Sequence, residues 1–330
     1  MIDTRTLLLS QSDVARCLKM GEVVDIVERT FRAHGEGRVV MPPKVNLDLS
    51  SMGLKHGINA LPAFVQGGAV YGIKWVGGFW ENPQRFQLPY LMAVLVLNDL
   101  RSGVPLAIMD ATRITAMRTG AAAAVAAKHL AAPGARVAAI VGCGVQGLAS
   151  LEALRVACPL QEIRAADARA EAREALAARA RELGLRAVAA ETIRAAVEGA
   201  DIIVTATTAD EPLVRREWVK PGAVVAKLGS FQELDDALTL GADKLVVDHR
   251  EQNQHRGELA HLFRTGRLTQ AGVHAQLGEI VAGSRPGRED AAETIVATLI
   301  GMGAEDVAVG EAVLQRARET GLGQRFDFLA

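Results

Sequence analysis

RVAAIVGCGVQG, residues 136–147, runs from an apolar stretch typical of a buried strand into a turn that fits the pattern G-x-G-x-x-G. In dinucleotide-binding βαβ units, Gly142 of such a pattern permits the tight turn, Gly144 lets the backbone approach the pyrophosphate, and Gly147 allows close helix–strand packing. A helix expected directly after the turn would offer free N–H groups to the phosphates. The alternative is a glycine-rich turn that binds nothing.

An acidic residue at the expected distance favours the ligand-binding interpretation. Asp167 ends the next predicted strand, EIRAAD, twenty residues after Gly147. A carboxylate there would accept hydrogen bonds from the adenosine ribose and repel a 2′-phosphate, which favours NAD. Arg169 could instead pair with the 2′-phosphate of NADP, or it is a solvated arginine at a helix start.

The rest of this half of the chain alternates strand and helix. After a long helix over residues 169–183, strands are expected at DIIVTAT, AVVAKL and KLVVD, and the tail from about Glu289 is expected to be helical. Continuous Val/Ile/Ala runs predict buried parallel strands, so the fold class is α/β with a doubly wound Rossmann sheet. Thr205, Thr207 and Thr208 end the first of these strands, where such a sheet presents its ligand crevice.

The first 115 residues or so have a different, α+β pattern. A helix is expected over residues 23–34, an extended segment over 45–49, a hairpin from LMAVLVL and VPLAIM, and an alanine-rich helix over 114–130. A Rossmann domain that starts this late requires a separate N-terminal domain.

Composition narrows the class of partner. The chain has 330 residues, a formal net charge of -1 and 49% hydrophobic residues, so no strong field of one sign points to nucleic acid or to a membrane surface. No apolar stretch reaches the roughly 20 residues of a membrane span, and the start lacks a leader pattern. We expect a cytoplasmic protein whose partner is a small molecule and whose three cysteines are reduced thiols.

Three cations stand in apolar surroundings. They are Lys44 in MPPKVNLDL, Lys74 in YGIKWVGGF and Arg118 in ITAMRTGAA. Lysine and arginine are seldom buried without a partner, so an anionic ligand is a reasonable hypothesis for each. For a single lysine on a strand, the alternative is a solvent-exposed face.

Several segments together resemble the ornithine cyclodeaminase/μ-crystallin family. They are MPPK, GIKWVGGFWENP, LNDLRSGVPLAIMD, ITAMRTGAAAAVAAKHLA, GCGVQG, ELD, and GMGAEDVA with a later GLG. The R-T-G helix followed by G-x-G-x-Q is the most specific portion. This family includes cyclodeaminases, alanine dehydrogenases and ketimine reductases, all acting on a carbon that bears both nitrogen and a carboxylate.

The resemblance implies a domain organisation and a site. A Rossmann domain over residues 115–299 would be inserted in a discontinuous substrate-binding and dimerisation domain made of residues 1–114 and 300–330, usually in a homodimer. Lys44 matches a residue for the substrate carboxylate, and Lys74 matches the active-site lysine. Arg118, with Thr119 beside it, matches an arginine near the cofactor phosphates and the substrate. Dinucleotide-binding positions fall on Val145, Gln146 and Asp167.

One segment departs from the family pattern. Residues 228–235 read LGSFQELD, where cyclodeaminases and alanine dehydrogenases carry G-x-D-x-P-G-K before E-L-D, so the catalytic aspartate is missing. A general acid/base raises the rate of a reaction by about 10²–10⁴-fold. Cyclodeamination depends on such a group more strongly than imine reduction does. The prediction is NAD(P)H-dependent reduction of a small 2-imino acid, or the reverse amino-acid dehydrogenation. Lys44 and Arg118 would hold the carboxylate, Lys74 would orient the substrate and transfer a proton, and Leu228, Gly229 and Ser230 would border the nicotinamide.

Two other functions stay open: an NAD-dependent ornithine or lysine cyclodeaminase, and a non-catalytic μ-crystallin-like binding protein. Alanine, a cyclic ketimine and an iminosuccinate-like compound all suit the site, and Arg85 or His56 could hold a second carboxylate. The H-x-x-E-x-x-H segment of His255, Glu258 and His261 lacks metal-site spacing, so we interpret it as a solvated helix face and expect no metal.

Overall fold

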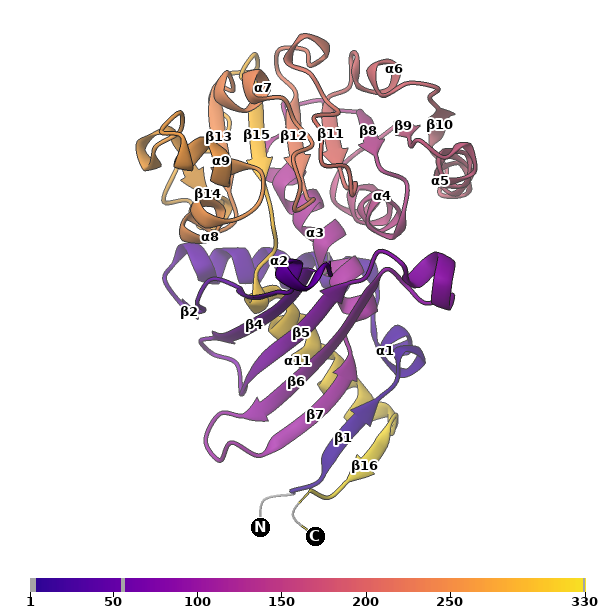
Figure 1. Ribbon diagram of the computed structural model, residues 1–330, viewed down its shortest axis with the longest axis vertical. Coiled ribbons are helices and arrows are strands. Elements are labelled where there is room, and N and C mark those ends of the chain that lie inside the picture. Colours follow the sequence, from indigo (N-terminus) through magenta and orange to yellow (C-terminus); the bar gives the residue numbers. More distant parts are fainter. Residues whose placement is uncertain (1–3, 55–56, 329) are drawn as a thin grey trace. The chain divides into compact units, whose positions relative to one another are not determined.

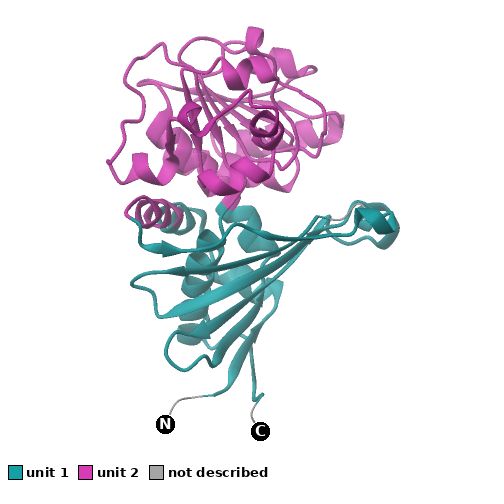
Figure 2. Cartoon of the chain, turned by 60° about the vertical axis from the view of Figure 1, so that its left-hand side comes forward, with its two compact units in different colours: residues 1–26, 37–118, 302–330 teal, residues 27–36, 119–301 magenta. Residues whose placement is uncertain are grey.

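The computed structural model describes residues 4–54, 57–328 and 330, and the chain divides into two compact units (Figure 2). Unit 1 comprises residues 1–26, 37–118 and 302–330, and unit 2 comprises residues 27–36 and 119–301. The boundaries at 114/115 and 299/300 that the family resemblance implies stay a prediction. No helix among the described residues is long and apolar enough to cross a membrane.

Unit 1 is a sheet of mixed strand direction with helices. Its elements are β1 (Thr6–Leu9), α1 (Gln11–Cys17), β2 (Val39–Val40), β3 (Val45–Asp48), η1 (Ser50–Met52), β4 (Gly57–Val65), β5 (Val70–Gly78), η2 (Asn82–Phe86), β6 (Leu91–Asp99), β7 (Pro105–Asp110), α11 (Gly303–Thr320) and β16 (Gln324–Phe326). Helices α2 (Met20–Gly35) and α3 (Thr112–Leu130) each begin in unit 1 and end in unit 2.

The strand order in this sheet is β16-β1-β7-β6-β5-β4-β2, with β3 on β4 (Figure 1). Strands β6 and β7 pair antiparallel, which confirms the expected hairpin, and α3 confirms the alanine-rich helix. Helix α11, from the other end of the chain, packs on β4, β5 and β6. The first seven residues of β5 alternate between buried and exposed positions, as expected when a helix covers one face of a sheet and leaves the other open.

Unit 2 contains the glycine turn. Its elements are β8 (Val137–Val141), α4 (Val145–Ala157), β9 (Glu162–Ala166), α5 (Ala170–Glu182), β10 (Arg186–Ala189), α6 (Ile193–Val197), β11 (Ile202–Thr205), η3 (Arg216–Trp218), β12 (Val224–Lys227), α7 (Asp236–Leu240), β13 (Lys244–Val247), α8 (Arg250–His255), α9 (Leu259–Arg264), η4 (Gln270–Gly272), β14 (Ala275–Gln276), α10 (Leu277–Val281) and β15 (Ile295–Thr298).

The sheet of unit 2 is parallel throughout, in the order β10-β9-β8-β11-β12-β15-β13-β14. The order reverses between β8 and β11, so the carboxyl ends of these two strands flank the topological switch point where such sheets bind ligands. This arrangement confirms the expected α/β class with a doubly wound parallel sheet.

The expectation of a helical tail from about Glu289 is wrong in its first part. Residues 295–298 form β15, which lies between β12 and β13 and is fully buried. The segment IVAT is short and mostly apolar, so only its place in the sheet distinguishes it from the start of a buried helix. The helix begins later, at Gly303.

Helices α3 and α4 approach closely at Gly120 in unit 2. A Cβ on this residue would stand 2.4 Å from the carbonyl carbon of Ala149 and 2.5 Å from its oxygen. These are backbone atoms of α4, so a side chain at position 120 forces one of the two helices to shift.

Gly120→Ala therefore tests this packing, because close packing and helix propensity change the free energy of unfolding in opposite directions. Helix propensity alone would raise the free energy of unfolding by about 1 kcal/mol, whereas overpacking against a backbone lowers it by about 1–3 kcal/mol. We expect a net loss, seen as a lower urea midpoint with little change in slope. A gain of stability would contradict the close approach of α3 and α4.

Candidate active site

Lys74 lies in the middle of β5 on the face that α11 covers. The neighbouring positions Ile73 and Trp75 are exposed, whereas only 1% of Lys74 is exposed. The alternative of a solvent-facing strand lysine is therefore wrong for Lys74. An ammonium buried to this extent requires a compensating charge.

Two acids at the start of α11 supply that charge. The Nζ of Lys74 lies 2.6 Å from Oδ2 of Asp306. Arg118 donates from Nε to Oδ1 of Asp306 at 3.1 Å and from Nη1 to Oε2 of Glu305 at 3.0 Å. We call these four residues the charge cluster. Both acids are fully buried and the arginine nearly so, and all four belong to unit 1.

The local structure makes these buried acids tolerable. Met302 is the N-cap of α11, so Glu305 and Asp306 lie in the first turn, where backbone N–H groups and the helix dipole stabilise negative charge. Two cations and two anions then leave the charge cluster formally neutral. The three segments that contribute to it, β5, α3 and α11, are far apart in the sequence.

The ammonium group of Lys74 has a pKa well below that of a free lysine. Burial, and after it the positive charge of Arg118, lower its pKa, the charges of Asp306 and Glu305 oppose both effects, and the resulting pKa is about 8. A lysine with a pKa near neutrality can both give and take a proton at physiological pH.

Lys44 lies directly before β3, which is separated from β5 and Lys74 by β4. Val45 of β3 pairs with Ala60 of β4, and Leu61 pairs with Lys74. The β3–β4 pairing begins at Val45, so Lys44 directly precedes the paired residues. Lys44 is partly buried.

Sequence reasoning missed Glu305 and Asp306 as members of the site. They stand in GMGAEDVA, which supported the family resemblance without receiving a role. A usable signal was present, because two adjacent acids are enclosed by small and apolar residues in the same way as Lys74 and Arg118. What the sequence did not contain was the pairing of these acids with those cations.

In unit 2, the glycine turn has the geometry that a dinucleotide requires. A Cβ on Gly142 (φ 95°) would lie 2.5 Å from the Ala206 oxygen, and one on Gly147 would lie 2.0 Å from the Gly142 oxygen. At Gly144, the N-cap of α4, a Cβ would meet nothing within 4 Å. The two outer glycines are thus required by packing, and the middle one faces open space, as an approaching pyrophosphate requires.

Val145 and Gln146 begin α4. Val145 is 70% exposed, and Oε1 of Gln146 is buried and accepts no hydrogen bond within the described part of the chain. A buried amide oxygen without a donor costs free energy unless a ligand or water satisfies it. Thr119, on α3, is nearly buried in the same unit.

Asp167 is tied to the glycine turn. Its Oδ2 accepts from the Cys143 N–H at 2.8 Å, and its Oδ1 accepts from the Arg169 N–H at 2.9 Å. The Arg169 side chain is 70% exposed, with its Nε 3.5 Å from Oδ1 of Asp167. The carboxylate is therefore fixed directly after β9, where the sequence predicts the adenosine ribose. Burial raises the pKa of the Cys143 thiol to about 12, so this cysteine is no nucleophile.

The loops after β11 and β12 contain the remaining predicted residues. The Thr207 hydroxyl accepts from the Ala209 N–H at 3.2 Å, which is the local turn bond weighed as the alternative to a cofactor contact, and Thr208 is exposed. Leu228 is buried, Gly229 is partly buried and Ser230 is exposed.

The interpretation of H-x-x-E-x-x-H as a solvated helix face is wrong for its central residue. Glu258 is 3% exposed and accepts hydrogen bonds from the N–H groups of Glu233 and Leu234. His255 ends α8 and His261 lies in α9, so the three residues do not share one helix. No group of potential metal ligands is found among the described residues.

Comparison with known proteins now adds to this geometry. A family model described as ornithine cyclodeaminase/mu-crystallin family matches residues 4–321. An alanine dehydrogenase of Archaeoglobus fulgidus is 36% identical over 98% of both chains. An archaeal alanine dehydrogenase dimer with bound NAD superimposes with a TM-score of 0.92, at 36% identity over 98% of this chain and 100% of the other.

Two further structures bear on the choice of reaction. The Δ¹-pyrroline-2-carboxylate reductase of Thermococcus litoralis, in complex with NADH and L-proline, has a TM-score of 0.91 at 32% identity over 97% and 99% of the two chains. A lysine cyclodeaminase has a TM-score of 0.87 at 28% identity over 98% and 96%. The same fold thus accompanies both reactions, and the residues must decide between them.

The charge cluster itself can be tested by titrating Lys74. In Asp306→Asn, one of the negative charges that support the ammonium is removed while burial and Arg118 remain. We expect the pKa of Lys74 to fall from about 8 by about one pH unit. The measurement is ¹³C NMR of protein labelled at lysine Cε, with the signal assigned by its loss in Lys74→Arg.

Glu319→Gln is the matched control, because it removes a carboxylate that is 70% exposed from the same helix. It should leave the titration of Lys74 unchanged. An unchanged or higher pKa in Asp306→Asn would contradict the assigned ion pair.

Proposed function

The chain belongs to the ornithine cyclodeaminase/mu-crystallin family, and within it we propose that this protein reduces a small 2-imino acid to the amino acid with NAD(P)H, or runs the reverse dehydrogenation. The observation that carries the proposal is the charge cluster, in which a buried lysine with a pKa of about 8 is held beside a buried arginine. Such a pair suits a substrate that bears a carboxylate and needs a proton at its nitrogen.

The dinucleotide is assigned to unit 2, where Gly142, Gly144 and Gly147 would hold the pyrophosphate and Asp167 the adenosine ribose. When bound, this cofactor supplies or accepts the hydride. The Asp167 carboxylate would repel a 2′-phosphate, so NAD is the proposed cofactor. Arg169, exposed and next to that carboxylate, keeps NADP as the alternative.

The substrate is assigned to unit 1. Arg118 and Lys44 would bind its carboxylate, and Lys74 would orient the imine and, once hydride has been added, give a proton to the amine nitrogen, or take it back from the ammonium in the reverse reaction. A zwitterionic substrate, with a carboxylate and a protonated imine, would leave the formally neutral charge cluster neutral. This favours a monocarboxylate, because each extra buried charge needs its own partner.

A second substrate carboxylate has no assigned partner in this proposal. The Arg85 side chain is 68% exposed and pairs with Glu81 four residues earlier on the same turn. His56, the other predicted candidate, lies outside the described residues.

The segment LGSFQELD favours reduction over cyclodeamination. It contains two acids, and both have structural partners. Glu233 is fully buried and accepts from backbone N–H groups, and Asp235 is the N-cap of α7, where it accepts from the Leu238 N–H at 2.7 Å and the Arg216 N–H at 3.2 Å. Neither carboxylate is available to replace the aspartate of the cyclodeaminase pattern.

The proposal is tested with a substrate panel. Pyruvate and other 2-oxo acids with ammonia or methylamine, cyclic imines such as Δ¹-pyrroline-2-carboxylate, and iminosuccinate are assayed by oxidation of NADH and of NADPH separately. We expect turnover of at least one monocarboxylic imine, with NADH preferred. Ammonia release from ornithine or lysine without net NADH change would favour the cyclodeaminase, and inactivity throughout would favour a binding protein.

Lys74→Ala belongs in the same assay as the variant that isolates the role of the lysine. It should lower turnover by at least about 100-fold, since it removes the proton donor, while the affinity for NADH stays within about twofold. Unchanged turnover in this variant would refute the role given to Lys74.

We also propose that the protein is a homodimer that uses the uncovered face of the unit 1 sheet. Trp75, Met92 and Val94 are 52%, 40% and 44% exposed, and they line an apolar groove together with Phe79 and Ile108. A monomer rarely exposes a continuous apolar face of this kind. A cytoplasmic location stays a prediction from the sequence.

Trp75→Glu should convert the dimer to a monomer in sedimentation equilibrium, because it places a charge in the middle of the apolar face. Val188→Glu is the control, since Val188 is 50% exposed but lies on β10 of unit 2. If both variants have the same dimer dissociation constant, the interface does not lie on this face of the sheet.

A further inference from the structure

The carboxyl ends of three neighbouring strands in unit 2 stand in one row. Thr205, the last residue of β11, pairs in register with Val141 at the end of β8 and with Lys227 at the end of β12. The glycine turn follows β8, and loops at Thr207 and Gly229 follow the other two strands. In a doubly wound sheet, these loops border the part of the ligand crevice beyond the pyrophosphate.

One buried carboxylate bonds to both loops. Oε1 of Glu233 accepts from the Thr207 N–H at 2.6 Å, and Oε2 accepts from the Gly229 N–H at 3.1 Å and from the Thr205 hydroxyl at 3.0 Å. Glu233 itself is 0% exposed. Charge-assisted bonds of this kind are stronger than neutral ones, so the side chain joins two loops that share no strand.

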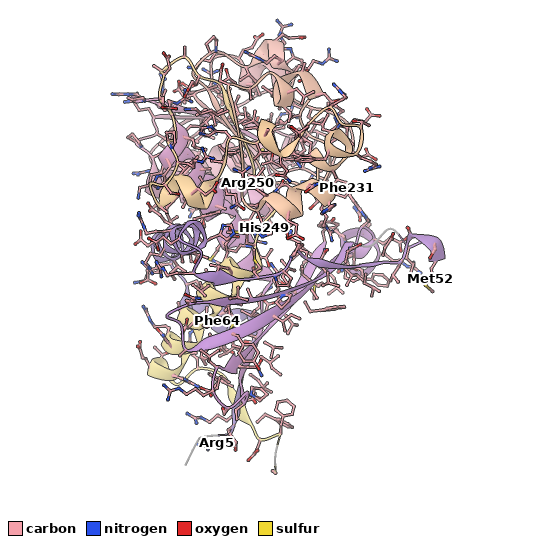
Figure 3. All side chains as sticks on the ribbon, turned by 90° about the vertical axis from the view of Figure 1, so that its left-hand side faces the viewer. Arg5, Met52, Phe64, Phe231, His249 and Arg250 are labelled. Atoms are coloured by element: carbon pink, nitrogen blue, oxygen red, sulfur yellow. The ribbon has the colours of Figure 1, made fainter. Side chains whose placement is uncertain are left out.

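The peptide groups around Gly229 are held from a second direction as well. Lys227, also fully buried, donates from Nζ to the Gly229 carbonyl at 2.6 Å. A Cβ on Gly229 would lie 2.5 Å from Oε2 of Glu233. The loop that continues through Phe231 (Figure 3) therefore begins at a residue whose N–H and C=O are both occupied and where a Cβ would displace the Glu233 carboxylate.

Glu233 is in turn fixed by Glu258. Oε2 of Glu258 accepts from the Glu233 N–H at 2.8 Å and the Leu234 N–H at 3.1 Å, and it lies 3.7 Å from Nζ of Lys227. Burial lowers the pKa of Lys227 and raises that of Glu258, and in each case the opposite charge of the other residue counteracts the burial. The result is a buried, hydrogen-bonded frame that connects the two loops.

We propose that Glu233 is a positioning residue that holds the loops at Thr207 and Gly229 in the arrangement required by the nicotinamide half of the dinucleotide. The adenosine half is assigned to the glycine turn and Asp167, and within the described part of the chain Glu233 accepts its hydrogen bonds from Thr205, Thr207 and Gly229 instead. The inference deepens the proposed function and rests on it, because it assumes that the ligand of unit 2 is NAD(H).

Glu233→Gln tests this through binding alone. The amide keeps the size of the carboxylate but cannot accept at both ends, so one loop N–H loses its partner. When the binding-competent arrangement becomes a minor population, the apparent dissociation constant rises by the reciprocal of that population. We expect NADH, measured by its fluorescence, to bind at least about tenfold more weakly. ADP-ribose, which lacks nicotinamide and is measured by calorimetry, should bind within about twofold of the wild type.

Thr205→Val provides a milder variant of nearly the same shape. It removes one of the three donors to Glu233 and should lower the affinity for NADH by about threefold, again without an effect on the affinity for ADP-ribose. Glu198→Gln is the control, because that carboxylate is exposed, belongs to unit 2 and pairs with Arg194 four residues earlier. It should change neither affinity.

A purely structural role for Glu233 predicts an equal loss of affinity for NADH and ADP-ribose, and that result would overturn the inference. Unchanged NADH affinity in both Glu233→Gln and Thr205→Val would overturn it too. Failure of the proposed function looks different, because the wild-type protein would then bind neither NADH nor ADP-ribose.

Discussion

The ion pair between Lys74 and Asp306 is the interaction on which unit 1 depends. A lysine in the covered face of a sheet is costly unless an anion accompanies it, and here that anion comes from a helix more than 200 residues later in the chain. Arg118, at the end of the unit 1 part of α3, needs the same two acids. The electrostatic requirement therefore places the first turn of the C-terminal helix against the N-terminal sheet, and buried apolar residues such as Val307 and Val313 add to the packing of this helix.

The same constraint gives the site its chemistry. Burial and the nearby Arg118 lower the pKa of Lys74, the neighbouring acids oppose them, and the resulting pKa of about 8 lies within reach of physiological pH. In unit 2, the two acids of the segment 228–235 have a different environment. Glu233 and Asp235 both bind backbone N–H groups, so in the proposed reaction they hold loops in place and proton transfer is assigned to the charge cluster.

Local patterns predicted local structure well. The glycine turn, the alanine-rich helix α3, the β6–β7 hairpin and the parallel strands β11, β12 and β13 each have a signal within about ten residues, and each is present. Prediction failed where the answer depends on distant partners. The four residues of β15 are recognised as a strand only by their neighbours in the sheet, and Glu258 is buried because backbone N–H groups at residues 233 and 234 need an acceptor. The partners of Lys74 and Arg118 were hidden for the same reason.

The central claim is that a hydride passes between the dinucleotide and the carbon that bears both nitrogen and carboxylate. It is tested most directly with NADH carrying deuterium at both C4 positions, reacted with a monocarboxylic imine and analysed by mass spectrometry and NMR. The account predicts one deuterium at the α carbon of the product amino acid for each NADH oxidised. Product without deuterium at that carbon would contradict it.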